Sequence, residues 1–358
     1  MIGAESGKPL SQLTTIGLGG PARLYKVVCS LDELRQALDQ CRSEGLPVWV
    51  LSGGSNIVVS DAGLSGLVLD IRLGGIAFER QPADRMRVTA AAGEDWDGLV
   101  GEATRRGYSG IECLSAIPGR VGATPIQNVG AYGQDVSQTI ESVDVLDRNT
   151  GDVTRLPAAE CAFGYRTSRF KHAERDRHIV VSVSFLLSEG PPALPSHREL
   201  QERLGLREGI SAQALRDAVL GLRRAKSMVV DETDPCSRSC GSFFVNPVVP
   251  AAVAEGIQAR FSSERVPAYA QPPALAKIAA AWLIEKSGLH KGYRQGLVGI
   301  SDKHSLAIVA RPGATSRDVV NFARSIQQRV HDNFGIWLSP EPIFWGFESM
   351  ERGLPLLD

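Results

Sequence analysis

The segment Pro118–Gly133, PGRVGATPIQNVGAYG, decides the fold prediction. Its sixteen residues hold four of the chain's 37 glycines, where an average segment of this length in 358 residues would hold about 1.7. Arg120 is its only charged residue, so it would make a poor solvated loop. Glycines let backbone amides approach a ligand closely, and we predict a loop that wraps a large, mostly uncharged ligand with a phosphate tail. A purely structural glycine-rich crossing is the alternative.

A second glycine loop, LSGGSN at Leu51–Asn56, lies between strands that we predict at residues 47–51 and 57–60. Its glycines, hydroxyls and amide are groups that can hold a phosphate. No lysine follows the loop, and the next element is a strand, so it is neither a P-loop nor a dinucleotide-binding fingerprint. A plain turn between strands is the alternative.

Three further motifs each place one reactive side chain on constrained backbone. GYRTSRFKH carries Arg166, which suits bidentate binding of a carboxylate, although a basic surface loop is the alternative. GSFFVNP carries Ser242 beside two phenylalanines that would anchor it in a core, but a serine without a nucleophile elbow is also typical of a structural strand. SPEPIFWG carries Glu341 between two prolines that restrict the backbone, and a surface glutamate is the alternative.

Hydrophobic periodicity and capping residues predict an α+β fold, because helices and strands intermix without a regular β-α repeat. The polar stretch Ser227–Gly241 is typical of a domain junction. The predicted helices cover residues 30–44, 96–106, 211–226, 272–287 and 316–334. The predicted strands after the second glycine loop cover residues 63–71, 87–92, 141–147, 178–187, 297–301 and 307–310.

Charge and composition exclude several classes of protein. The 39 basic and 40 acidic residues give a net charge of −1, which argues against a nucleic-acid binder. No apolar run is long enough to span a membrane, and no export signal is visible, so we expect a cytoplasmic protein. The six cysteines are too sparse for a disulfide scaffold, and Cys236 and Cys240 lack a second ligand pair, so no metal site is expected.

In their order along the chain, with LSGGSN first and SPEPIFWG last, the five motifs resemble the MurB family, the UDP-N-acetylenolpyruvoylglucosamine reductases of peptidoglycan precursor synthesis, from about Thr14 to Gly346. The resemblance implies a two-part FAD-binding domain of the vanillyl-alcohol-oxidase (PCMH) type plus a C-terminal α+β substrate-binding domain. The two FAD-binding parts would cover residues 1–74 and 75–226, and the substrate-binding domain residues 227–335. The segment 336–358 would return near the active site.

The resemblance also implies non-covalent FAD and NADPH as the hydride donor. NADPH would reduce the flavin, and the reduced flavin would pass hydride to the enolpyruvyl group of UDP-N-acetylglucosamine enolpyruvate, giving UDP-N-acetylmuramate. The residues that it assigns to FAD are Ser52, Gly53, Gly54, Ser55, Asn56, Ile57, Pro118, Gly119, Gly122, Ala123, Thr124, Gln127, Asn128, Gly130, Ala131, Tyr132, Gly133 and Arg223.

Three residues match the catalytic positions of the family. Ser242 would be the proton donor, while Arg166 and Glu341 would polarise the substrate carboxylate and stabilise the charge that develops. The positions assigned to substrate binding are Tyr165, His197, Lys226, Asn246, Tyr269 and His304. His197 is a departure, because one of the two family types has a tyrosine in this loop, Pro191–Leu200.

Two other functions are compatible with parts of the pattern. One is another FAD-dependent oxidoreductase, of the alcohol oxidase type, on the same scaffold; the other is a non-catalytic nucleotide-binding module. The catalytic matches argue against both, because alcohol oxidation needs no proton donor beside a carboxylate clamp. We therefore expect a small-molecule enzyme that acts as a monomer, without a nucleic-acid or membrane partner.

Overall fold

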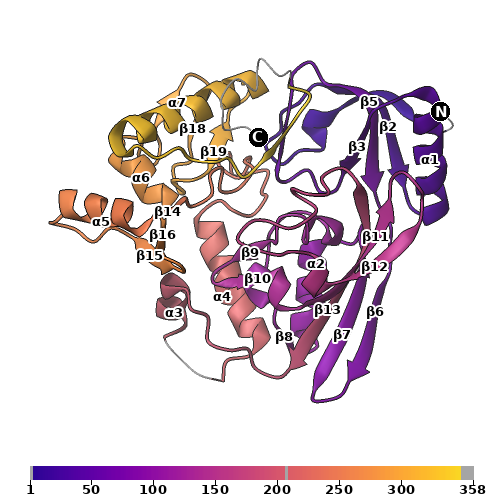
Figure 1. Ribbon diagram of the computed structural model, residues 1–358, viewed down its shortest axis with the longest axis horizontal. Coiled ribbons are helices and arrows are strands. Elements are labelled where there is room, and N and C mark those ends of the chain that lie inside the picture. The colour runs from indigo at the N-terminus through magenta and orange to yellow at the C-terminus, as the bar shows by residue number, and fades with distance from the viewer. Residues whose placement is uncertain (1–2, 206–208, 348–358) are drawn as a thin grey trace. The chain divides into compact units, whose positions relative to one another are not determined.

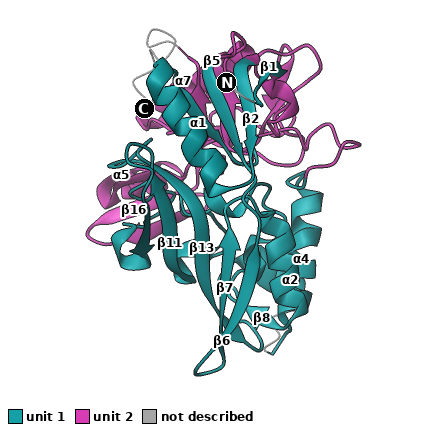
Figure 2. Cartoon of the chain, turned by 90° about the vertical axis from the view of Figure 1, so that its right-hand side faces the viewer, with its two compact units in different colours: residues 1–8, 22–54, 65–229 teal, residues 9–21, 55–64, 230–358 magenta. Residues whose placement is uncertain are grey.

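The computed structural model describes residues 3–205 and 209–347. These residues form two compact units, which Figure 2 shows in different colours. Unit 1 contains residues 1–8, 22–54 and 65–229, and unit 2 contains residues 9–21, 55–64 and 230–358. The last chain crossing between them follows Val229, inside the polar stretch that the sequence marks as a junction.

The N-terminal part of unit 1 is a four-stranded sheet beside one helix. Helix α1 (Leu31–Glu44) begins where the Ser30 side chain accepts a hydrogen bond from the Glu33 N–H, and it ends at Gly45 in the left-handed conformation. The strand order is β1 (Glu5–Pro9), β2 (Pro21–Val28), β5 (Leu64–Ile71) and β3 (Val48–Leu51), and β3 runs parallel to β5.

The larger sheet of unit 1 is antiparallel (Figure 1). Its strand order is β12 (Val153–Pro157), β11 (Ile140–Asp147), β13 (His178–Glu189), β7 (Arg85–Ala91) and β6 (Ile76–Gln81), and β8 (Tyr108–Ser109) also pairs with β13. Alternate residues of β7 are buried, so one face of the sheet packs on the core and the other is polar. On the core side, Trp96 of helix α2 (Trp96–Arg105) contacts Phe185.

Two further helices complete unit 1. Helix α4 (Ala212–Ala225) packs against α2 and against the short helix α3 (Arg198–Leu204). The strands β9 (Gly130–Ala131) and β10 (Gln134–Asp135) form a small hairpin at the end of the glycine-rich segment. Single-turn 3-10 helices lie at Glu112–Leu114, Val121–Ala123, Val136–Gln138 and Ala158–Glu160 in unit 1, and at Leu10–Gln12 in unit 2.

The described part of unit 2 combines small sheets with three helices. The strands β4 (Ile57–Val59) and β20 (Ile343–Trp345) pair in parallel. Two three-stranded sheets have the orders β14 (Val248–Pro250), β16 (Leu275–Ile278), β15 (Ala268–Gln271) and β17 (Arg294–Gln295), β18 (Val298–Ile300), β19 (Ile308–Ala310). The helices are α5 (Ala251–Arg260), α6 (Ala280–Lys286) and α7 (Ser316–Phe334).

The segment 55–64 joins the core of unit 2 through an N-terminal helix cap. The Asp61 carboxylate accepts the backbone N–H groups of Ser316 and Arg317 at 2.8 and 3.0 Å, beside the capping box of Thr315 and Asp318. A carboxylate at this end also complements the helix dipole. The cap therefore fixes a segment from early in the sequence against helix α7.

The helices predicted at residues 30–44, 96–106, 211–226 and 316–334 are confirmed to within one residue at each end. The helix predicted over 272–287 is wrong in its first half, which is a turn followed by strand β16. The residues of β16 alternate between half-buried and buried, with Ala276 and Ile278 inward. That period of two is the pattern of a strand, and two prolines at the start of the segment oppose a helix. Only Ala280–Lys286 is helical.

Candidate functional site

The two glycine loops approach each other within unit 1. A Cβ atom added to Gly53 would lie 2.4 Å from the Cα of Gly119, closer than real Cβ atoms come to any atom. Gly119 itself has a φ of +132°, a conformation that favours glycine. The side-chain oxygen of Ser52 is buried and has no hydrogen-bond partner among the described residues. Backbone in close contact beside an unsatisfied buried hydroxyl fits a loop that receives polar atoms from a bound cofactor.

The second half of the LSGGSN motif belongs to unit 2. The Asn56 amide donates a hydrogen bond to the backbone oxygen of Glu341 at 3.2 Å, and the Asn56 carbonyl accepts the Ile343 N–H at 3.0 Å. Ile57 begins the buried strand β4, and the Ser55 carbonyl lies 3.4 Å from the Thr15 hydroxyl. These three predicted cofactor residues thus connect the motif to the segment that carries Glu341.

The single charge of the glycine-rich segment is held by the protein. The Arg120 guanidinium donates to the Gly93 carbonyl at 3.2 Å and lies 3.7 Å from the carboxylate of Asp70, which is 1% exposed. The Tyr25 hydroxyl donates to the same carboxylate at 2.7 Å. Burial and the nearby Asp70 carboxylate raise the pKa of Tyr25, so this phenol stays protonated. Arg120 therefore anchors the segment to strand β5.

Asn128 and Arg166 tie the glycine-rich segment to the GYRTSRFKH turn. The buried Asn128 amide donates to the Gly164 carbonyl at 3.0 Å, and its oxygen accepts the Ser137 N–H at 3.0 Å. The Arg166 guanidinium donates to the backbone oxygens of Gly130 and, at 3.5 Å, Asn128. Both Asn128 and Arg166 have positive φ values, of +50° and +54°, a strain that is common at functional sites.

The other predicted residues of this loop lie close to these contacts. The Thr124 hydroxyl donates to the Val121 carbonyl at 2.8 Å, and Gly122 lies so near Ala92 that a Cβ atom would meet the alanine Cβ at 2.6 Å. Tyr165 is 45% exposed, and its ring centre lies 5.7 Å from the Arg166 guanidinium carbon. Four of the remaining positions assigned to FAD in the segment are half-buried, namely Pro118, Ala123, Gln127 and Ala131, whereas Gly133 is exposed.

His197, Tyr132 and Arg223 form a cluster in unit 1, in which Arg223 is buried and the other two residues are half-buried. The rings of His197 and Tyr132 meet edge to face at 5.0 Å, and the Arg223 guanidinium lies near the Tyr132 hydroxyl. Burial lowers the pKa of His197, an effect to which the neighbouring Lys226 ammonium adds, so the imidazole is neutral near pH 7. His197 Nδ1 and Arg223 Nε are buried without hydrogen-bond partners among the described residues. These nitrogens are available to a ligand.

Lys226 makes an ion pair with Glu199, which lies on α3 two residues after His197. The family resemblance implies that Lys226 binds the substrate, and the sequence gives no reason to select Glu199. An acidic residue beside a histidine on a short helix carries no signal of its own, so only the fold reveals this pairing. A ligand phosphate that binds Lys226 would have to replace the Glu199 carboxylate.

Ser242 and the backbone of Glu341 belong to one rigid arrangement in unit 2. The Glu341 N–H donates to the Phe243 carbonyl at 2.8 Å, and the Val245 N–H donates to the Ser339 carbonyl at 3.1 Å. Phe243 is fully buried, so the residue after Ser242 is packed in the core. The Ser242 Oγ lies 3.4 Å from the Nε2 of His304. The family resemblance points to both residues, but nothing in the sequence predicts that they are neighbours.

Asn246 and Tyr269 lie elsewhere in unit 2. The Asn246 Oδ1 accepts the Ala280 N–H at 2.9 Å, so this side chain caps the N-terminus of α6. Tyr269 lies on β15 and is 55% exposed. An exposed aromatic ring beside a small sheet can stack on a ligand base or sugar.

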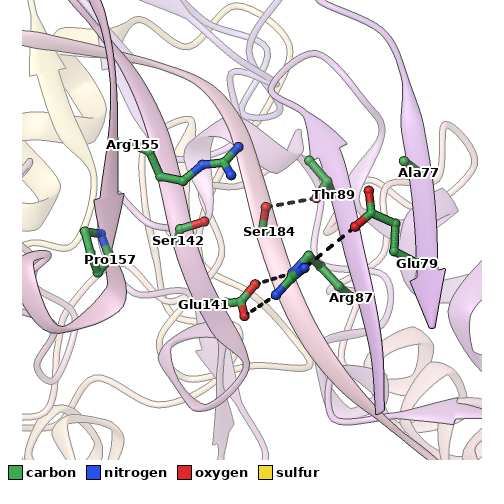
Figure 3. A pocket seen from close by; sticks show the side chains of 9 residues that line it. All are labelled: Ala77, Glu79, Arg87, Thr89, Glu141, Ser142, Arg155, Pro157 and Ser184. Atoms are coloured by element: carbon green, nitrogen blue, oxygen red, sulfur yellow. Dashed lines mark hydrogen bonds and ion pairs between the residues drawn. The ribbon is translucent and has the colours of Figure 1, made fainter. Parts of the chain in front are cut away.

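A cavity of about 490 Å³ on the polar face of the large sheet contains none of the predicted site residues. Figure 3 shows the Arg87 guanidinium between the carboxylates of Glu141 and Glu79, with a hydrogen bond between the Thr89 and Ser184 hydroxyls. The charged groups along this face are paired with one another, which is typical of a solvated sheet surface.

Of the three catalytic candidates, Ser242 and Glu341 lie in unit 2 and Arg166 lies in unit 1. Across residues 3–205 and 209–347, no three histidine, cysteine or acidic side chains gather in a way that could hold a metal ion. In the same part of the chain, no helix is long and apolar enough to cross a membrane.

Fold and site together define a flavin-binding protein with a separate C-terminal domain. A family model described as FAD binding domain matches residues 22–157. The model of the UDP-N-acetylenolpyruvoylglucosamine reductase C-terminal domain matches residues 233–345.

Curated relatives cover nearly the whole chain. The UDP-N-acetylenolpyruvoylglucosamine reductase of Thermobifida fusca is 45% identical over 94% of this chain and 97% of its own length. That of Saccharopolyspora erythraea is 42% identical over 94% of both chains. The crystal structure of the corresponding enzyme (MurB) from Thermus caldophilus matches with a TM-score of 0.64 and 26% identity, over 96% of this chain and 98% of that chain.

The chain belongs to the UDP-N-acetylenolpyruvoylglucosamine reductase family. The predicted resemblance, the α+β fold with an FAD-binding part and a C-terminal domain, and the assignment to FAD-dependent oxidoreductases are thereby confirmed.

Proposed function

We propose that this protein catalyses the NADPH-dependent reduction of UDP-N-acetylglucosamine enolpyruvate to UDP-N-acetylmuramate. Family membership over 94% of the chain carries the proposal. When bound, FAD accepts a hydride from NADPH and supplies it to the methylene carbon of the enolpyruvyl group. The protein has to bind these three anionic ligands, orient the substrate carboxylate and deliver one proton.

The residues fit the cofactor. The two glycine loops are in close contact, since a Cβ atom added to Gly53 would lie 2.4 Å from the Cα of Gly119. The buried Ser52 hydroxyl has no hydrogen-bond partner among the described residues. We assign Ser52–Ile57 and Pro118–Gly133 to FAD binding. Arg223, which lies near Tyr132, is assigned to FAD as well. Amides in such loops hold a pyrophosphate without a local excess of cations, in line with a net charge of −1.

We assign the chemistry of the substrate to three side chains. Arg166 binds the substrate carboxylate with its planar fork, and Glu341 helps to stabilise the charge that develops next to it. Ser242 Oγ–H gives its proton to the carbon beside the carboxylate. Tyr165, His197, Lys226, Asn246, Tyr269 and His304 are proposed to hold the nucleotide sugar. The Glu199–Lys226 ion pair must open for the Lys226 part of this assignment.

Separate half-reactions test the function. Under anaerobic conditions, NADPH should bleach the flavin absorbance of the purified holoenzyme, and UDP-N-acetylglucosamine enolpyruvate should restore it. Ser242→Ala should keep the first step and slow the second by about 10²–10⁴-fold, because it removes a proton donor. Equal losses in both steps would contradict the role of Ser242. No recovery of absorbance in the unmodified enzyme would reject the function itself.

We infer that the enzyme works as a monomer in the cytoplasm, where NADPH and the nucleotide-linked substrate are found. Sedimentation at micromolar concentration would test the oligomeric state. We also infer FAD-binding parts at residues 1–74 and 75–226 and a substrate-binding domain at 227–335, with 336–358 returning to the site. The part 348–358 lies outside the described residues. The family-model boundary at residue 233 and the unit crossing after Val229 support the last junction.

A further inference from the structure

Ser242 lies between two backbone segments that hold it on both sides. The Phe243 N–H donates to the Leu306 carbonyl at 2.8 Å, and the Phe243 carbonyl accepts the Glu341 N–H at 2.8 Å. The turn that carries His304 is fixed as well, since the Ala307 N–H donates to the His304 carbonyl at 3.1 Å. Both partners of the Ser242–His304 contact therefore stand on backbone with little freedom to move.

The side chains next to His304 in the sequence are occupied by other partners. The Lys303 ammonium lies 3.0 Å from the Asp234 carboxylate, and the Ser305 hydroxyl donates to the carboxylate of Glu285. These contacts hold the turn at two further points. Of the residues at positions 303–305, His304 is the one whose side chain is directed at Ser242.

The hydrogen bonds of the His304 ring determine which nitrogen carries the hydrogen. The Leu306 N–H lies 3.4 Å from Nδ1 and can only donate, so Nδ1 must be the acceptor nitrogen. In a neutral imidazole the other nitrogen then bears the hydrogen, which makes Nε2 a donor. Nε2 lies 3.4 Å from Ser242 Oγ, a long contact of the kind that catalytic pairs show before substrate binding tightens them. Ser242 Oγ is thus the acceptor.

We propose that His304 is a positioning residue for the proton donor: its Nε2–H occupies a lone pair of Ser242 Oγ and leaves the hydroxyl hydrogen to the substrate. This inference rests on the function proposed above. In the protonation step, the Oγ–H bond breaks, and a C–H bond forms at the carbon beside the carboxylate. The bonding electrons stay on Oγ, where the Nε2–H hydrogen bond stabilises the negative charge. Water then returns a proton to Oγ, and the Nε2 hydrogen stays on His304 throughout.

Two substitutions at His304 separate this role from simple substrate binding. Glutamine can place an amide N–H near the position of Nε2, whereas alanine removes the donor. His304→Ala should slow substrate reduction by about 10–100-fold, the value of one hydrogen bond to a charged group, and His304→Gln should recover most of that loss. Both variants should keep flavin reduction by NADPH, and His304→Ala should lower the rate of substrate reduction by a larger factor than it weakens substrate binding.

A spectroscopic measurement tests the geometry without turnover. In holoenzyme with ¹⁵N-labelled histidine, long-range ¹H–¹⁵N spectra should show His304 as the Nε2–H tautomer. Ser242→Ala should shift the Nε2 resonance and leave Nδ1 nearly unchanged. The exposed His290, on the same unit, provides a matched control, because His290→Ala should alter neither half-reaction.

Each outcome decides the proposal. An Nδ1–H tautomer, a glutamine variant as slow as the alanine variant, or an alanine variant with weakened substrate binding at unchanged rate would overturn it. Failure of the unmodified enzyme to reduce the enolpyruvyl substrate would instead reject the proposed function, while the tautomer measurement would still report on the Ser242–His304 contact. If His304→Ala does not fold, the glutamine variant and the spectrum of the unmodified enzyme remain decisive.

Discussion

The predicted flavin loops of unit 1 and the Ser242 segment of unit 2 use different parts of the chain to present polar groups. In the flavin loops the polar groups belong to a backbone with an unusual conformation. Gly53 and Gly119 are in close contact, and Asn128 and Tyr132 have positive φ values of +50° and +53°. In the Ser242 segment the backbone is hydrogen-bonded to two neighbouring segments, and the buried Phe243 side chain fixes it in the core. Loops that surround a large cofactor need close backbone approach, whereas a proton donor needs a side chain in one defined position.

Because the two regions are built differently, they should be sensitive to different kinds of substitution. A glycine-built loop should fail when a side chain is added, because the added atoms fill space that backbone occupies. A segment held by core packing should fail when a side chain is removed, because a cavity weakens its anchor. Substitutions of these two kinds should therefore impair different steps of the reaction.

Gly53→Ala should have the largest effect. Its Cβ would lie 2.4 Å from the Gly119 Cα, so one of the two loops must move. We expect an enzyme that retains little flavin, with a dissociation constant for FAD raised at least about 100-fold, or about 2.7 kcal/mol. Flavin content after gel filtration and a titration of apoenzyme with FAD measure this change.

Gly74→Ala provides the control for this substitution in unit 1. A Cβ atom there would meet only Glu94 Oε1, at an ordinary distance of 3.5 Å. Its flavin content should equal that of the unmodified enzyme. If Gly53→Ala retains FAD equally well, the close approach of the loops has no part in cofactor binding.

Phe243→Ala should have the next largest effect, in unit 2. Phe243 is fully buried and contacts the rings of Phe244 and Phe344 at 5.3 and 6.2 Å. The cavity should cost about 3–5 kcal/mol of stability. Substrate reduction should fall much more than flavin reduction by NADPH, because the loosened segment carries Ser242. Thermal unfolding and the two half-reactions measure the two effects.

The fully buried Phe185 of unit 1 is the matched control. Phe185→Ala should cost similar stability and weaken flavin retention instead, because its ring packs on Trp96 beneath the large sheet. Phe243→Leu leaves a smaller cavity and should give the same pattern at lower cost if the alanine variant does not fold. Equal losses in both half-reactions for the Phe243 variants would contradict the division of roles.

The features that could be predicted from the sequence are those that depend on a few residues close together in the chain. The glycine density of Pro118–Gly133 predicts close backbone approach, because glycine has no side chain to keep other backbone away. This signal can be read directly from the local sequence. Ser30 and Gly45 predicted both ends of α1 for the same reason. The segment 272–287 misled because its apolar residues satisfy a helical spacing and an alternating one at once, and pairing with β15 decided between them.

Contacts between distant residues could not be predicted in this way. Ser242 and His304 are 62 positions apart and meet because Phe243 pairs with the backbone of Leu306. Glu199 reaches Lys226 only because α3 packs on α4. The motif residues themselves were selected from local patterns, but their partners depend on tertiary packing that no local pattern encodes.

Asp97→Asn should have the smallest effect. It tests a contact between two helices of unit 1 that lies outside the glycine loops themselves. The Asp97 carboxylate accepts Arg216 of α4 at 2.5 and 2.9 Å and the Ala116 N–H at 2.6 Å, so it links the helix of Arg223 to α2. Burial alone would raise the pKa of Asp97, but the hydrogen bonds from Arg216 and Ala116 outweigh it and hold the pKa below 3.8. Since the side chain is 33% exposed, we expect a loss of only about 1 kcal/mol.

The pH dependence identifies the cause of this loss. Because the folded protein binds the Asp97 proton more weakly than the unfolded chain, the carboxylate stabilises the fold fully above the ordinary value of 3.8. That contribution disappears as the pH falls through the lowered pKa. The difference in melting temperature between Asp97→Asn and the unmodified enzyme should therefore be largest near neutral pH and shrink below about pH 4. Asp39→Asn, in an exposed pair with Arg42, should change little at any pH. A difference for Asp97→Asn that is constant with pH would mean that packing, and not the paired carboxylate, holds α4 against α2.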